Sequence, residues 1–154
     1  MNEWANVNFQ GELERIQQSF SFDFVGIALI QSPDRNFELR WTNVVGNRSE
    51  RYRRIVLQSG KGVAGLVFKT GKPIYVGDAE TDLSPDDLFN YPIIMTEKLK
   101  SFGAVPLYKY NQVKGVLLVG FRAKRKLTET IFEQFKETIK DGFGPFYDKE
   151  MVKE

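Results

Sequence analysis

The sequence predicts an α+β domain in which helices cover a central antiparallel sheet. Two segments, residues 24–45 and 103–122, each read as a pair of strands joined by a turn. An amphipathic helical stripe lies near each end of the chain. Two hairpins between terminal helices are typical of a sheet that packs against helices. The length of 154 residues suits a single domain with one substantial core.

The first half of the chain begins with a predicted helix over residues 1–22. Its apolar stripe recurs every three or four positions, at Phe9, Leu13, Ile16 and Phe20. Residues 24–31 form a nearly continuous apolar run, which indicates a strand covered on both faces. Residues 32–36 have the proline, aspartate and asparagine of a turn. Residues 37–45 alternate, and Phe37, Leu39 and Trp41 share one face.

The middle of the chain consists of short predicted elements. Residues 47–54 are expected to form a loop or one helical turn, and residues 55–57 a short strand. A helix is expected from Gly62 to Thr70, because Gly71 suits a left-handed helix end and Pro73 prevents continuation. A short strand at residues 74–76 and an acidic loop at residues 77–82 follow.

The second half opens on a helix start, because Ser84 can cap a helix that has Pro85 in its first turn. Residues 91–94 are expected to interrupt this helix, and residues 95–99 to resume it as a turn. Strands at 103–110 and 113–122 precede a last helix, which Thr128 caps. The stripe of that helix is Ile131, Phe132, Phe135 and Ile139. A break at 142–145 and a polar tail complete the chain.

Composition excludes several kinds of chemistry. The chain has no cysteine and no histidine, so it cannot build a disulfide, a thiolate nucleophile, a Cys/His metal site or an imidazole base. With 22 Lys and Arg against 20 Asp and Glu, the net charge of +2 does not favour general binding to nucleic acids or membranes. No catalytic arrangement, cofactor or metal ligand set is visible, and the protein is expected to be a cytoplasmic non-enzyme.

A family resemblance lies in Ser59–Asp82, "SGKGVAGLVFKTGKPIYVGDAETD". This segment resembles the middle of a GAF domain, in which a glycine-rich turn enters a short helix and a Gly-x-Pro break follows. The closing segment "GAVPLYKYNQVKGVLLVGF" is similar to the last GAF hairpin. The resemblance implies that residues 1–154 form a single stand-alone GAF domain. In that fold the terminal helices lie on one face of the sheet, and a ligand pocket lies under loops and short helices on the other.

Residue types separate the subfamilies. GAF domains that hold a bilin covalently and GAF-type free methionine sulfoxide reductases use cysteines, which this chain lacks. The Asn-Lys-x-x-Phe-x-x-x-Asp-Glu pattern of cyclic-nucleotide GAF domains is also absent. The chain resembles the remaining small-ligand receptors, and among them a nitrate receptor. That resemblance rests on Trp41, on Gly62-Val63-Ala64-Gly65 and on Tyr91-Pro92-Ile93.

Nitrate is a planar anion of low charge density, so its site needs a few neutral donors and close apolar walls. The first amides of a helix lack intrahelical partners and favour an anion. We therefore expect the amides of Val63 and Ala64 to face the ligand, together with the amide of Ile93, which Pro92 would free. The indole of Trp41 offers another donor. The resemblance implies that Tyr91 and Pro92 form the remaining walls of the ligand pocket.

The resemblance also implies a partner, a sensor histidine kinase. The ligand-free protein is expected to restrain phosphorylation of this kinase, and bound nitrate is expected to relieve that restraint. A homodimer through the terminal helices is plausible. Two alternatives stay open at this stage: a receptor for another metabolite such as a branched-chain amino acid, whose ammonium group Glu97 could bind, and a ligand-free dimerisation or interaction module. The acidic cluster in residues 78–87 and the basic runs at 51–54 and 124–126 are expected to be solvated surface.

Overall fold

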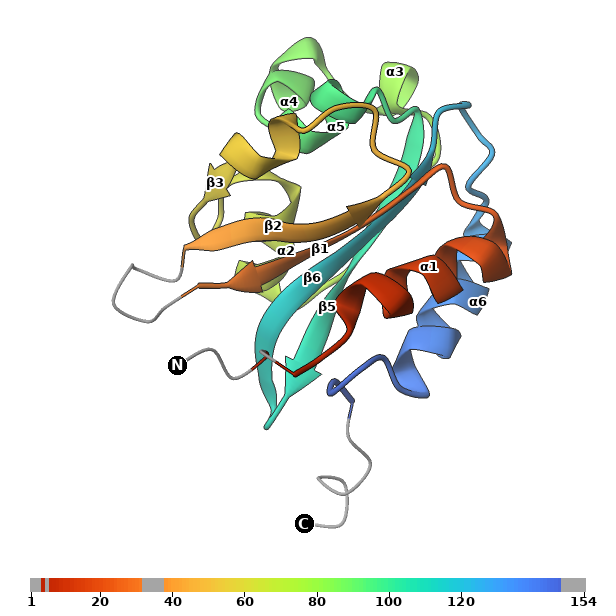
Figure 1. Cartoon of the computed structure of the whole chain (residues 1–154). Helices are drawn as coiled ribbons and strands as arrows, with labels where there is room; N and C mark the ends of the chain where they lie inside the picture. The colour runs from red at the N-terminus through yellow and green to blue at the C-terminus, as the bar shows by residue number, and fades with distance from the viewer. Residues whose placement is uncertain (1–3, 5, 32–37, 148–154) are drawn as a thin grey trace.

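The computed structural model describes residues 4, 6–31 and 38–147, and these residues form one antiparallel sheet flanked by helices (Figure 1). Its six strands lie in the order β3-β2-β1-β6-β5-β4. The elements in chain order are α1 (Phe9–Phe20), β1 (Phe24–Ile30), β2 (Leu39–Val45), η2 (Arg51–Arg54), β3 (Val56–Leu57), α2 (Gly62–Thr70), β4 (Ile74–Val76), α3 (Ala79–Asp82), α4 (Pro85–Phe89), α5 (Pro92–Glu97), β5 (Ser101–Lys109), β6 (Gln112–Phe121) and α6 (Glu129–Lys140).

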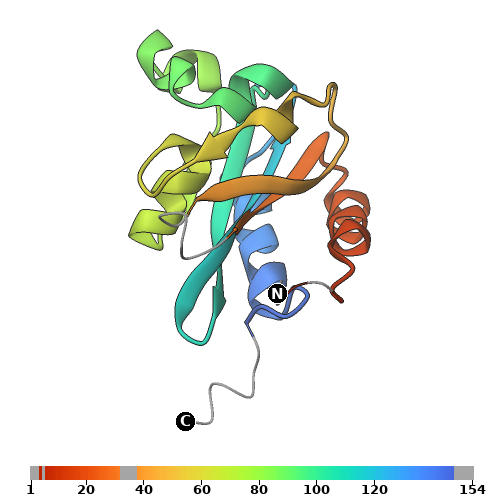
Figure 2. The same ribbon diagram turned by 60° about the vertical axis from the view of Figure 1, so that its left-hand side comes forward.

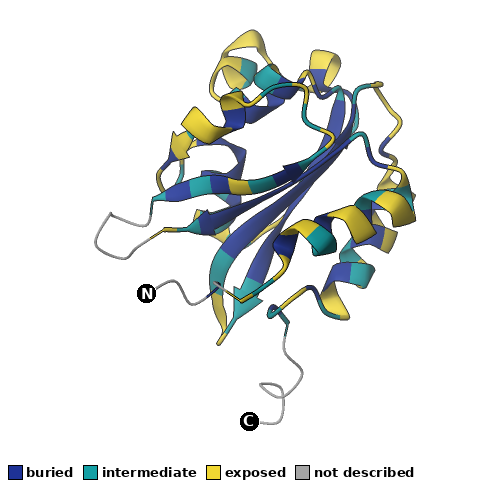
Figure 3. Ribbon diagram, viewed as in Figure 1, coloured by how far each residue is buried: buried dark blue, intermediate teal, exposed yellow. Residues whose placement is uncertain are grey.

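The two faces of the sheet carry separate hydrophobic clusters. On one face α1 and α6 pack together, and their apolar stripes join inward side chains of β1, β5 and β6. On the other face lie α2 and the short helices at the end of the sheet (Figure 2). The central strands β1 and β6 are buried along most of their length (Figure 3). The predicted α+β fold, with terminal helices on one face and short helices on the other, is thereby confirmed.

Most predicted elements are confirmed, and their ends follow local signals. α2 runs from Gly62 to Thr70, and Gly71 ends it with a φ of 68°. The Thr128 side chain caps α6 by accepting from the Ile131 amide at 3.1 Å. β5 and β6 meet at a turn in which Tyr110 and Asn111 both have positive φ, as a two-residue hairpin turn requires.

Three predictions need correction. The first helix begins at Phe9, and the described residues before it, 4 and 6–8, are not helical, because the Asn8 side chain accepts from the Gly11 amide at 3.0 Å and caps the helix. Residues 77–82 are not a loop throughout, because Asp78 caps the helical turn α3. α5 begins at Pro92, so Ile93 and Ile94 are helical; proline is well suited to a first helical position.

Some predictions fall outside the described residues. These are the turn at 32–36, the start of the second strand at Phe37, the first part of the N-terminal helix at residues 1–3 and the polar tail at 148–154. Within the described part of the chain, no helix is long and apolar enough to cross a bilayer.

Candidate functional site

The start of α2 presents backbone donors without partners. Lys61 precedes the helix and makes no side-chain cap. Among the hydrogen bonds of the described residues, none has the amide of Val63 or Ala64 as its donor. Val63 and Ala64 are 1% and 0% exposed, so these amides do not face bulk water. Buried backbone donors normally have an acceptor, and the helix dipole at this end favours an anionic one.

Glycine at position 65 allows the turn before α2 to pack closely on the first turn of the helix. The Gly60 amide donates to the Gly65 carbonyl at 2.8 Å. A Cβ at Gly65 would lie 2.4 Å from the carbonyl oxygen of Gln58, closer than such atoms can approach. The glycine-rich segment therefore fixes where the free amides of Val63 and Ala64 lie.

A third backbone donor lies at the start of α5. Pro92 is the first helical residue, and Tyr91 before it supplies no side-chain cap. The Tyr91 carbonyl accepts from the amides of Ile94 and Met95 at 3.1 and 3.2 Å. The amide of Ile93 donates to no acceptor within the described residues, and Ile93 is 1% exposed.

Trp41 on β2 supplies the fourth donor. Its side chain is 3% exposed, and its indole Nε1 is buried with no hydrogen-bond partner among the described residues. Trp41, Val63, Ala64 and Ile93 all belong to the cluster on the α2 face of the sheet, and Tyr91 packs against that cluster. A buried N–H without an acceptor is costly, so a small polar ligand at this place would satisfy it.

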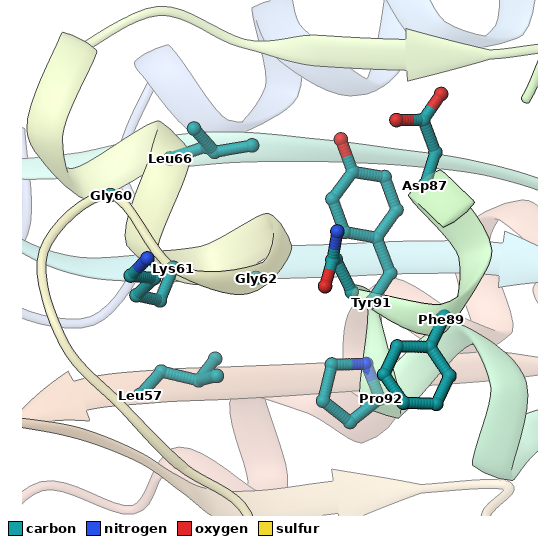
Figure 4. A pocket seen from close by; sticks show the side chains of 10 residues that line it. Leu57, Gly60, Lys61, Gly62, Leu66, Asp87, Phe89, Tyr91 and Pro92 are labelled. Carbon is teal, nitrogen blue, oxygen red and sulfur yellow. The ribbon is translucent and has the colours of Figure 1, made fainter. Parts of the chain in front are cut away.

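A cleft of about 460 Å³ opens between the start of α2 and the α4–α5 segment. Its lining includes two of the six predicted site residues, Tyr91 and Pro92 (Figure 4). The other predicted residues, Trp41, Val63, Ala64 and Ile93, lie in the buried cluster rather than along this cleft. Tyr91 lines the cleft and also packs against the cluster.

The remaining lining residues of the cleft are not among the six predicted site residues. They are Leu57, Gly60, Lys61, Gly62, Leu66, Asp87, Phe89 and Asn90. Phe89 is 77% exposed, although it is aromatic and lies beside the site. The only local signal for this lining is its position in the chain, because each of these residues lies within a few positions of a predicted site residue.

The electrostatic setting of the cleft is mixed. Lys61 and Asp87 bring opposite charges to its lining. Burial, and to a smaller extent the nearby charge of Asp87, raises the pKa of the Tyr91 hydroxyl above its ordinary value of 10.0. Tyr91 is therefore a neutral hydroxyl at physiological pH, and this wall of the cleft does not repel an anion.

Two buried carboxylates, Glu97 and Asp78, are engaged in structural contacts. Glu97 is fully buried and pairs with Arg122 at 2.6 Å, so it is not a free partner for a ligand's ammonium group. Asp78 is also buried, where it accepts from the amides of Glu80 and Thr81. Within the described residues, no group of three acidic side chains is arranged to hold a metal ion.

The fold and the short-helix face define the class of protein. The family model described as GAF domain matches residues 10–140 of this chain, so the chain belongs to the GAF domain family. The chain is also similar to NreA from Staphylococcus aureus, solved as a variant mutated in its nitrate binding site. The two are 39% identical with a TM-score of 0.74, over 79% of this chain and 88% of that one. The hypothetical protein SA1058 from S. aureus is similar at the same identity and TM-score, over 98% of its length.

The chain is also similar, at lower sequence identity, to two other proteins. The transcriptional activator RamA of Corynebacterium glutamicum is 31% identical over 102 residues, which is 66% of this chain but 36% of RamA. The chain thus spans about a third of that activator. The free methionine-R-sulfoxide reductase of Neisseria meningitidis has a TM-score of 0.65 at 20% identity, over 87% of this chain and 74% of the reductase. That likeness shows the fold alone.

Proposed function

We propose that this GAF domain is a nitrate receptor that holds the anion among Trp41, Val63, Ala64, Tyr91, Pro92 and Ile93. The observation that carries the proposal is the buried indole Nε1 of Trp41, which has no partner among the described residues. It belongs to the same cluster as Val63, Ala64 and Ile93, whose amides are also without acceptors in the described part of the chain. The similarity to NreA, a protein with a nitrate binding site, supports the same ligand.

The chemistry of these groups suits nitrate better than a more highly charged anion. The donors are one indole and three backbone amides, and none carries a full charge. Desolvating a phosphate or sulfate without a charged partner would be very costly. A planar monoanion that is weakly hydrated fits neutral donors between flat apolar walls. Tyr91 and Pro92 supply such walls at the cleft.

Calorimetric titration of the purified protein with sodium nitrate, in buffer free of nitrate and chloride, tests the proposal. We expect saturable one-site binding with nitrate and none with sulfate or leucine, while nitrite tests selectivity between related anions. The Trp41→Phe variant should lose affinity while remaining folded, because it keeps an aromatic wall and loses the donor. No heat with nitrate at millimolar concentration would reject nitrate as the ligand.

The downstream role that we propose is control of a sensor histidine kinase in the cytoplasm. Ligand-free protein would restrain kinase phosphorylation, and nitrate would release it by stabilising one arrangement of the loops around Tyr91 and Trp41. The domain would pair with a second copy through α1 and α6. Autophosphorylation of the candidate kinase, measured with the receptor present and with or without nitrate, tests this role. A nitrate effect that Trp41→Phe abolishes would support it, and no effect of the receptor would reject it.

The alternatives are less well supported. A branched-chain amino acid needs an acceptor for its ammonium group, and Oε1 of Glu97 already accepts from Arg122 and from the Arg48 amide. A ligand-free interaction module would give no binding heat with any small molecule. The buried donor of Trp41, which has no partner in the part of the chain that the structure describes, favours a receptor over such a module.

A further inference from the structure

The side chain of Arg122 connects segments that are distant in the sequence. It follows β6 and is 15% exposed. Its Nε donates to the Glu97 carbonyl at 2.8 Å, and its Nη2 donates to the Glu97 carboxylate at 2.6 Å. The same Nη2 donates to the Gly46 carbonyl at 3.0 Å. One guanidinium therefore holds the last residue of α5 and the end of β2 together.

These two segments carry parts of the proposed anion site. α5 begins at Pro92, which lines the cleft, and contains Ile93, and β2 contains Trp41. Glu97 strengthens the connection, because its Oε1 also accepts from the Arg48 amide at 2.8 Å, just beyond β2. Oε2 of Glu97 is buried without a partner among the described residues, so Arg122 is the cation that balances this carboxylate.

Arg122 also contacts Asp23, which lies between α1 and β1. Its backbone amide donates to the Asp23 carboxylate at 2.7 Å. Its Nη1 lies 3.4 Å from the Asp23 carbonyl. Asp23 lies in the turn between α1 and β1, two residues after the left-handed Ser21 that ends α1. The network thus extends from the site to the end of α1.

We propose that Arg122 is a positioning residue that fixes α5 against the end of β2, and so sets the affinity of the site without touching the ligand. It also joins both segments to the turn that ends α1. This proposal rests on the proposed function for its ligand. The fork of arginine matters here, because the carbonyls of Glu97 and Gly46 accept from two different nitrogens of the guanidinium, whereas a lysine side chain has a single nitrogen.

The test compares the wild-type protein with three variants. The double variant Arg122→Met/Glu97→Met removes both charges, so neither is left buried without its partner. Arg122→Lys keeps the charge but not the fork. Arg53→Gln is the matched control, because it removes an exposed arginine whose Nε donates to Glu50 at 2.7 Å. Amide hydrogen exchange in the ligand-free protein and the nitrate Kd are measured for each folded variant.

In the double variant we expect the amides of Ile94, Met95 and Asp23 to exchange about tenfold faster or more. The amide of Gly71, at the far end of α2, should keep its wild-type rate. We also expect the nitrate Kd to rise about tenfold or more in the double variant and by less in Arg122→Lys, and to stay unchanged in the control.

Two outcomes overturn the proposal: wild-type exchange rates for Ile94 and Met95 in the folded double variant, or a nitrate Kd within about twofold of wild type. A wild-type exchange rate at Asp23 alone overturns the connection to α1. If the wild-type protein binds no nitrate, the proposed function fails, and the exchange rates still decide whether Arg122 positions α5.

Discussion

Trp41 lies opposite Ala28 in the pairing of β1 with β2, and the next pair is Asn43 with Ile27. Thr42 is therefore an extra residue in β2, a bulge that reverses the alternation of side chains beyond it. As a result Trp41 and Val44 both lie on the α2 face. The methyl group of Ala28, directly across from Trp41, leaves room for an indole between the strands and α2.

This arrangement predicts that Trp41→Phe separates binding from folding. The variant keeps an aromatic wall but loses the indole donor, so the nitrate Kd should rise about tenfold or more. The free energy of unfolding should fall by less than about 2 kcal/mol, because the variant also removes a buried donor that has no acceptor. Calorimetry and urea denaturation measure the two effects.

Trp4→Phe is the control for that experiment. Trp4 is the other tryptophan and packs against Phe146, with ring centroids 5.2 Å apart. Both residues lie in the hydrophobic cluster that α1 and α6 form with the sheet. Its replacement should leave the nitrate Kd unchanged. Wild-type nitrate binding by Trp41→Phe would show that the indole is core packing and not a donor to the ligand.

Elements that are set by local signals could be predicted from the sequence. The C-terminal end of α2 follows from Gly71, which adopts a left-handed conformation that few other residues accept. The bulge at Thr42 could not be predicted, since register depends on the partner strand. The acidic composition of residues 77–82 predicts a loop, whereas α3 forms because the Asp78 side chain caps it and the Ala79 amide donates to the distant Lys100 carbonyl at 2.8 Å.

The candidate site also has parts that local sequence signals predict and parts that they do not. Helix-start chemistry and the family resemblance led to Val63, Ala64 and Ile93, whose sequence neighbours carry the signal. The network around Arg122 joins residues 25, 76 and 99 positions apart, and no local pattern reports such contacts. Contacts of this kind appear only when the sheet brings its strand ends together.

Gly65→Ala should disturb the site through the backbone. The added methyl group would meet the Gln58 carbonyl at 2.4 Å, so the turn before α2 must move away from the helix. We expect a loss of about 1–3 kcal/mol in the free energy of unfolding and a weaker affinity for nitrate. Lys61→Ala, at a neighbouring exposed position without a side-chain cap, should change the free energy by less than about 0.5 kcal/mol. Equal urea midpoints for the two variants would contradict this account of the turn.

Nitrate affinity should depend little on pH. The chain has no histidine, and the pKa of Tyr91 is raised by burial and by Asp87. A raised pKa keeps the hydroxyl protonated up to at least its ordinary value, so no group of the proposed site changes charge between about pH 6 and 9. The Kd from calorimetry should stay within about twofold over that range. Tyr91→Phe should show the same flat profile, whereas a steep fall in wild-type affinity above pH 6 would show that the site contains a titrating group.

Asp78 should contribute to stability in a manner that depends on pH. Burial opposes ionisation of its carboxyl, but hydrogen bonds from Thr81 and the charges of Arg125 and Lys124 outweigh burial and hold its pKa below the ordinary value of 3.8. A lowered folded-state pKa means that this stabilisation is complete above the unfolded pKa and is lost as the pH falls through the folded one. Asp78→Ala should therefore lower the Tm by a few degrees at pH 7 and by less near pH 3.

Asp78→Asn is the matched variant, because its side-chain oxygen can still accept from the amides of Glu80 and Thr81. It should recover the part of the Tm that comes from capping α3, and its difference from wild type should become smaller as the pH falls from 7 to near 3, because the stabilisation that depends on the charge of Asp78 decreases below the unfolded pKa. Thermal unfolding of the three proteins at both pH values measures this. A difference between Asp78→Ala and wild type that does not vary with pH would show that Asp78 acts through its hydrogen bonds alone, and that its charge contributes nothing to the fold.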